Sequence, residues 1–169
     1  MKLFSTIEAL QQPYGDRLTL KQGKYYFRDA LATRHSNNHL SPSQIQYAIF
    51  AYLPSWVNAL MRVRNCIVSV FGFKVGKDSL RPESSELSVG DRAGFLTISE
   101  KFEDEIISYA EDKHMDFYLS VAIKNGNVIV STLVNKKTLI GRIYVNAILP
   151  FHYVIARTVI NNAIKAGRI

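Results

Sequence analysis

Two aspartates and a histidine stand at alternate positions in the chain, as Asp112, His114 and Asp116. Because successive side chains of a strand point to opposite faces, an early strand start would place all three on one face, as a metal site or an acid–base pair built on the histidine. That face continues through Tyr118 and Ser120 and lies opposite an apolar set, so we expect it to face solvent. We therefore interpret the trio as a solvated salt-bridge cluster and expect no metal.

His152 is a second candidate for chemistry. Pro150 is typical of the first position of a helix, which would put His152 in the first turn, where the positive end of the helix dipole disfavours a charged imidazole. The side chain could be a base or a hydrogen-bond acceptor at the mouth of a pocket, or it could pack under a preceding helix. No serine or cysteine stands in a nucleophile-elbow context.

Arg64 is the third candidate, in a segment whose other residues are largely apolar. If it points inward it needs a buried partner, which Asp112 or Glu105 could supply. A ligand carboxylate or phosphate is the alternative partner. Cys66, the single cysteine, excludes an internal disulfide and zinc sites with several thiolates, and it fits a reducing compartment.

The composition of the 169 residues, with 47% apolar and 21% charged, is typical of one soluble globular domain. The net charge of +7 is segregated: residues 1–81 hold 11 Lys/Arg and 4 Asp/Glu, residues 82–116 hold 3 and 10, and residues 117–169 hold 7 and none. An acidic middle between basic flanks, without an arginine-rich run, disfavours nucleic-acid binding. Glu8 stands where a signal peptide needs an uninterrupted apolar segment. The apolar stretch 48–61 is too short to span a bilayer. We expect a cytoplasmic protein without a transmembrane segment.

The first half of the chain contains clear boundaries of elements. Residues 24–33 have the aromatic content of a strand. Ser41-Pro42-Ser43-Gln44 is a helix start with a capping box, and Pro54 must end that helix or kink it before a second one follows. Residues 74–92 collect glycine, proline and charge and indicate a long loop.

The second half alternates as strands do before it ends in a helix. Asn125-Gly126 is a strong signal for a type I′ hairpin, because both residues tolerate a positive φ. The last helix is predicted to begin at Pro150 and to end before Gly167. The predicted strands are residues 95–101, 105–110, 115–124, 128–134 and 139–147.

This order of elements is that of the helix-grip fold, shared by the START and birch-pollen-allergen groups, in which a curved antiparallel sheet wraps around a long C-terminal helix. We predict an α+β fold of this kind, with two short helices after the first strand. Residues 1–23 would form an N-terminal arm and residues 24–169 a single domain. An ordinary α+β sandwich with a filled core is the rival.

Alternation within the strands predicts which face is which. In the last predicted strand, this alternation places Gly141 and Ile143 on the inner face and Arg142 on the outer face. The Arg142 guanidinium could then reach Asp116, two strands away. In the strand 115–124, four apolar side chains should face the C-terminal helix: Phe117, Leu119, Val121 and Ile123.

Three blocks occur in order between about residue 40 and the C-terminus: Pro54-Ser55-Trp56-Val57 with Leu60-Met61-Arg62-Val63-Arg64-Asn65 and Phe71-Gly72, then Asp112-Lys113-His114-Met115-Asp116-Phe117, then Gly141-Arg142-Ile143-Tyr144 with Pro150-Phe151-His152. They resemble a bacterial family, domain of unknown function 2867, found alone and fused behind short-chain dehydrogenase-like domains. Such sequences often carry arginine after the Asp-Phe pair, where this chain has Tyr118-Leu119-Ser120, which argues against an anion site there. The resemblance implies no activity, because the family has none assigned.

We hypothesise that the protein binds a small apolar or amphipathic molecule non-covalently between the sheet and the C-terminal helix, without a cofactor. The loop 74–92 would form the entrance. The expected ligand-binding residues are Trp56, Leu60, Arg64, Phe117, Leu119, Ile143, Phe151, His152 and Ile155.

Two other function classes stay open. An enzyme of the cyclase, hydratase or isomerase kind would use His152 and Arg64 as polar groups within the apolar pocket. An interaction domain would bind anionic surfaces with an affinity that falls as salt rises. Its cations would be Lys136, Lys137, Lys165 and Arg168. The sequence pattern predicts no particular oligomeric state.

Overall fold

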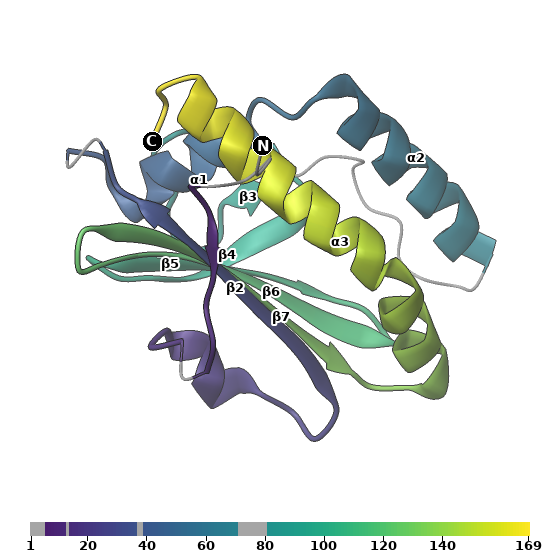
Figure 1. The fold of residues 1–169 in the computed structure, drawn as a ribbon. Helices are drawn as coiled ribbons and strands as arrows, with labels where there is room; N and C mark the ends of the chain where they lie inside the picture. The colour runs from purple at the N-terminus through teal and green to yellow at the C-terminus, as the bar shows by residue number, and fades with distance from the viewer. Residues whose placement is uncertain (1–5, 13, 37–38, 71–80) are drawn as a thin grey trace.

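The computed structural model describes residues 6–12, 14–36, 39–70 and 81–169, and the side chains of residues 63–70 lie outside this description. The described strands form one curved antiparallel sheet with the helices α1, α2 and α3 on one side of it (Figure 1). The predicted α+β fold with a long C-terminal helix is confirmed. From edge to edge the strands are β1 (Glu8–Ala9), β2 (Tyr26–Arg34), β7 (Asn127–Lys136), β6 (Met115–Lys124), β5 (Glu105–Glu111), β4 (Leu96–Lys101) and β3 (Arg92–Ala93).

The two helices after β2 begin where local chemistry predicts. In α1 (Pro42–Phe50) the Ser41 side chain accepts from the amide of Gln44 at 3.3 Å, and the Gln44 side chain accepts from the amide of Ser41 at 3.0 Å. These two bonds satisfy helix-start amides that have no partner within the helix. Pro54 then separates α1 from α2 (Ser55–Val70). Gly72 and part of the predicted loop 74–92 lie outside the described residues.

The centre of the sheet is built by sequence-local and sequence-distant pairing together. Asn125 and Gly126 have φ values of 51° and 72°, as a tight turn with two left-handed residues requires, and they join β6 to β7. On its other side β7 pairs with β2, so that Tyr26 lies opposite Asn135 and Arg34 opposite Asn127. The longest strands therefore lie at the middle of the sheet.

The last helix is longer than predicted. α3 runs from Leu139 to Lys165, so the expected strand at 139–147 is wrong, and Pro150 lies inside the helix rather than at its start. The Thr138 side chain caps α3 by accepting from the amide of Gly141 at 3.1 Å. Gly141 and Val145 are buried and stand four positions apart, which is the helical spacing.

Both faces of the sheet are covered in the described structure. Phe117, Leu119, Val121 and Ile123 belong to the cluster that packs against Val159, Ile160 and Ala163 of α3, so their predicted direction is confirmed. The opposite face is not wet as expected, since Ser120 and Ala122 are 0% exposed. Residues before β2, including the 3-10 helix η1 (Arg17–Lys21), cover that face (Figure 1).

Candidate functional site

The start of α3 is fastened to the turn between β5 and β6. Nδ1 of His114 lies 2.9 Å from the Thr138 hydroxyl, and the His114 carbonyl accepts from the amides of Lys137 at 2.9 Å and Thr138 at 3.4 Å. An Asp112 carboxylate oxygen accepts from the His114 amide at 3.0 Å. Asp112 and His114 are 9% and 5% exposed, so the expected solvated cluster is in fact a buried anchor for α3.

Asp116 pairs with Lys137, whose ammonium also donates to the Asp112 carbonyl. The two charged groups are 2.7 Å apart, and Glu111 contacts the same ammonium at 3.1 Å. The hydrogen bond to Asp116 raises the pKa of Lys137 above its ordinary value. Arg142 was expected to reach Asp116. It lies instead in the first turn of α3, with its Cζ 3.6 Å from the centroid of the Tyr25 ring. The described residues contain no group of three or more metal-ligating side chains.

Gly141 lies where α3 comes closest to this turn. A Cβ atom at this position would clash with the backbone carbonyl oxygen of His114. The sequence pattern predicted this glycine on the inner side of a strand. It instead allows the helix to touch the backbone of the neighbouring turn.

The middle of α3 packs on the sheet without burying any of its side chains completely. The helix is described throughout, and between Val145 and Val159 none of its residues is buried. The core beneath consists of two buried clusters, and half-buried Phe117 packs against both. One buried cluster surrounds Val159 and Ile160, and a second, smaller cluster surrounds Val145.

A polar row marks the border between these two clusters. On β2, Asp29 stands between Phe27 of the smaller cluster and Leu31 of the larger one. Thr132 of β7 lies opposite Asp29 in the sheet and is 7% exposed. The incompletely buried middle of α3 therefore lies over a sheet face that, along β2, is apolar at Phe27, polar at Asp29 and apolar again at Leu31.

His152 of α3 completes this polar row. Its Nε2 lies 3.1 Å from the Asp29 carboxylate, and the two side chains are 20% and 12% exposed. The ring of Phe27 meets the imidazole edge-on, with the ring centroids 5.3 Å apart. Because α3 begins at Leu139, His152 lies in the middle of the helix and not in its first turn, and it contacts β2.

The residues predicted to bind a ligand are divided among several environments. Leu119 is buried, and Phe117, Leu60 and Ile155 are half-buried. Ile143, Phe151 and Trp56 are 63%, 57% and 42% exposed. For Ile143 the inward direction predicted from a strand is wrong, because the helix turns this side chain outward. The side chain of Arg64 lies outside the described residues.

The outward face of α3 is apolar along its first half. Of the described helices, α3 is long and apolar enough to cross a membrane by length and composition, and 17% of its most apolar stretch is buried. The absence of a transmembrane segment, expected from the sequence, stays a prediction. The large apolar side chains exposed on this helix are Leu139, Ile140, Ile143, Phe151, Tyr153 and Val154.

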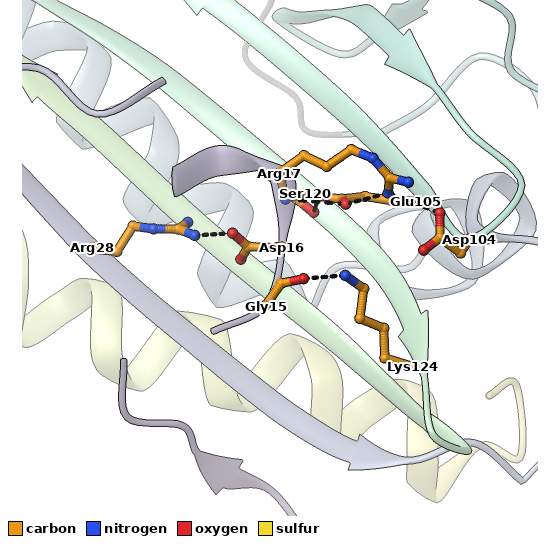
Figure 2. Close-up of polar contacts among 8 residues, drawn as sticks. All are labelled: Gly15, Asp16, Arg17, Arg28, Asp104, Glu105, Ser120 and Lys124. Carbon is orange, nitrogen blue, oxygen red and sulfur yellow. Dashed lines mark hydrogen bonds and ion pairs between the residues drawn. The ribbon is translucent and has the colours of Figure 1, made fainter. Parts of the chain in front are cut away.

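A second polar cluster lies on the other face of the sheet, under the N-terminal residues (Figure 2). Glu105 is 0% exposed, and its carboxylate accepts from the Ser120 hydroxyl at 2.6 Å and from the Arg17 guanidinium at 2.9 Å. The bond to Glu105 is the main reason that the pKa of Arg17 is raised. Asp104 contacts the same guanidinium at 2.8 Å. Glu105, which was considered as a partner for Arg64, therefore holds η1 against the sheet.

Two further contacts of the same segment appear in Figure 2. Arg28 pairs with Asp16, and both side chains are 1% exposed, while Lys124 donates to the Gly15 carbonyl. In the described part of the chain, Nε and Nη1 of Arg28 have no hydrogen-bond partner. Sequence reasoning missed this cluster, because its partners lie up to 109 positions apart. Its arrangement indicates a structural role in docking the N-terminal segment.

Comparison with known proteins identifies the family of this chain. The model of a family described as protein of unknown function (DUF2867) matches residues 22–159. The chain belongs to this family. The description of this family assigns no function to its members. No curated protein and no solved structure matches the chain.

Proposed function

We propose that this member of DUF2867 binds a small amphipathic molecule, without covalent chemistry, between the middle of α3 and the sheet. The observation that supports this most directly is the incomplete burial of α3 between Val145 and Val159, where the helix lies over two core clusters that meet at half-buried Phe117. Side chains that face the sheet without being buried leave apolar surface for another molecule to cover. Leu149, Ile155 and Ala156 are such side chains, since each packs against a core cluster and is still partly exposed.

The polar end of the ligand would lie beside the pair of His152 and Asp29. In the neutral tautomer whose Nε2 donates to Asp29, the imidazole of His152 presents Nδ1 as a hydrogen-bond acceptor. A hydroxyl or another neutral donor suits this arrangement. A carboxylate does not, because it would lie close to Asp29.

The test is binding by the full-length protein, with and without a filled space. Freshly purified protein is analysed by native mass spectrometry, and binding is then measured by displacement of anilinonaphthalene sulfonate with a long-chain alcohol. Ala156→Phe places a ring on the sheet side of α3 and should weaken alcohol binding about tenfold or more. Ala147→Phe on the exposed side should bind as the wild type does.

Circular dichroism of both variants shows whether the fold is retained. Unchanged alcohol binding in a folded Ala156→Phe variant, or the absence of saturable binding in the wild type, would overturn the proposal. The polar end is tested with the methyl ether of the same alcohol, which has no donor. The wild type should prefer the alcohol about tenfold, and His152→Leu should remove the preference.

The pair of His152 and Asp29 also bears on the catalytic alternative. An imidazole oriented by a carboxylate is the usual arrangement of a general base, and its Nδ1 would be the basic atom here. The role given to Arg64 in that alternative stays a prediction. We therefore place non-covalent binding first, and we retain the cytoplasmic location as a prediction.

A further inference from the structure

The outer stripe of α3, which we define as Leu139, Ile140, Ile143, Phe151 and Val154, is a continuous apolar surface. At 3.6 residues per turn these five positions fall within about one third of the helix circumference. Their exposed fractions run from 43% for Ile140 to 69% for Leu139. Ala147 and Pro150, which lie between them, are exposed too and carry no charge. An exposed apolar surface of this kind usually marks a site that another molecule or a membrane covers.

Aromatic rings and cations border the outer stripe. At one end Tyr25, 44% exposed, is stacked by Arg142 at 3.6 Å, and Lys24 lies 5.4 Å above the same ring. Farther along, Arg157 donates to the carbonyl of Tyr153, whose side chain is 41% exposed. Rings with one polar edge and long basic side chains are the residues that protein surfaces place at the headgroup level of a bilayer.

The charges within α3 itself are all positive, because the helix carries Arg142, Arg157 and Lys165 and no carboxylate. Residues 117–169 contain seven lysines and arginines and no aspartate or glutamate. The carboxylates at the start of α3, Glu111 and Asp116, are both paired with Lys137. A second copy of the chain would bring the same cations face to face, whereas an anionic surface would complement them.

The rest of α3 determines how the helix could meet such a surface. Its opposite side is held in the protein by Gly141, Val145, Val159, Ile160 and Ala163, which are buried. The helix therefore cannot leave the sheet to cross a bilayer without exposing this core. It can lie along the surface of the bilayer, as amphipathic interfacial helices do.

We propose that the outer stripe of α3 docks the protein on an anionic lipid bilayer, with the helix parallel to the surface and its basic residues among the headgroups. This inference does not depend on the proposed binding of a small molecule. The outer stripe and the side chains facing the sheet are opposite sides of the same helix. Each can be changed without the other.

The test is co-sedimentation of the full-length protein with vesicles. Vesicles of phosphatidylcholine with about one third phosphatidylglycerol should retain the protein, and vesicles of phosphatidylcholine alone should retain about tenfold less. Binding to the anionic vesicles should fall as salt rises. The double variant Ile143→Glu, Phe151→Glu should lose about tenfold or more of its binding, because it places acid within the apolar stripe.

Leu20→Glu is the matched control. Leu20 is 89% exposed on η1, on the other side of the sheet, so this variant should bind vesicles as the wild type does. Equal loss in the control and the double variant would overturn the proposal, as would equal binding to neutral and anionic vesicles. A third outcome is that the wild type does not bind vesicles but dimerises in sedimentation velocity, and that the double variant is a monomer. This outcome would overturn the proposal and assign the stripe to contact with a second copy of the chain.

The two proposals fail separately. Ala156→Phe should bind vesicles normally while losing the long-chain alcohol. The variant Ile143→Glu, Phe151→Glu should bind the alcohol normally while losing the vesicles.

Discussion

Gly141 is a position where a single methyl group should matter. Alanine in place of glycine normally stabilises a helix by about 1 kcal/mol. Here the added Cβ would meet the His114 carbonyl oxygen, which is backbone and cannot move aside cheaply. We expect Gly141→Ala to reduce the free energy of unfolding by about 1–3 kcal/mol, as overpacking does. Urea denaturation measures this, and a more stable variant would show that the helix can shift away.

Two half-buried tyrosines of the sheet, Tyr109 and Tyr118, predict a loss of stability in alkali. Burial, followed by the charge of Asp116, raises the pKa of Tyr109 well above the ordinary value of 10.0 and raises that of Tyr118 as well. Above about pH 10 the unfolded chain therefore loses these protons while the folded chain keeps them, so stability falls as pH rises. The raised pKa of Lys137 adds to the same fall above its ordinary value of 10.5.

Tyr109→Phe tests this explanation. The free energy of unfolding of the wild type should fall between about pH 10 and pH 11, and the variant should show a shallower fall because one of the shifted groups is gone. Lys137 and Tyr118 remain in the variant, so some of the slope should persist. An equal slope in both proteins would mean that Tyr109 is ionised as readily in the folded chain as in the unfolded one.

At the scale of elements, the N-terminal segment should depend on Glu105. Glu105→Gln removes the buried charge that Arg17 contacts, so we expect a loss of about 1–3 kcal/mol and faster tryptic cleavage after Arg17 and Lys21. Asp104→Asn is the control. Asp104 contacts the same guanidinium, but it is 42% exposed, and its replacement should cost about 0.5 kcal/mol or less. Equal effects of the two variants would contradict the assignment.

Hydrogen exchange should distinguish the parts of α3. Residues 159–165 include side chains buried in the larger core cluster. Between Val145 and Val159 no residue of the helix is buried. We expect the middle of the helix to exchange faster than residues 159–165. A saturating long-chain alcohol should slow the exchange of the middle specifically, if it binds there.

The elements that the sequence predicted correctly are those with local signals. The capping box at Ser41 and the Asn125-Gly126 turn each need only a few neighbouring residues. The first half of α3 was predicted as a strand because Leu139, Gly141, Ile143 and Val145 alternate. The helical spacing of Gly141 and Val145 is present in the same residues, so periodicity alone could not decide between them.

For the candidate site, the sequence identified His152 but not its partner. Asp29 stands 123 positions earlier, and only the packing of α3 on β2 brings the two together. The cover over the second face of the sheet was missed for the same reason, since Arg17 and Glu105 are 88 positions apart. Contacts of this kind depend on the topology of the whole sheet and leave no local pattern.

At the scale of the whole molecule, the two faces of the sheet differ in how they are closed. The N-terminal segment closes one face with buried ion pairs, among them Arg28 with Asp16. On the other face, α3 is docked near Val145 and again beyond Val159, with an unburied stretch between. The face under the N-terminal segment is therefore held by ion pairs, and the incompletely buried face is the one where we propose that binding occurs.

The pairing of β2 with β7 sets the order in which this chain can fold as it is synthesised. Tyr26 leaves the ribosome long before Asn135, its partner in the sheet. At roughly 5–20 residues per second, β2 waits for several seconds before β7 exists. Until then the edge of β2 that faces β7 is unpaired, and only the short strand β1 can pair with the other edge. The nascent protein therefore passes through a period in which a chaperone would protect this open edge from aggregation.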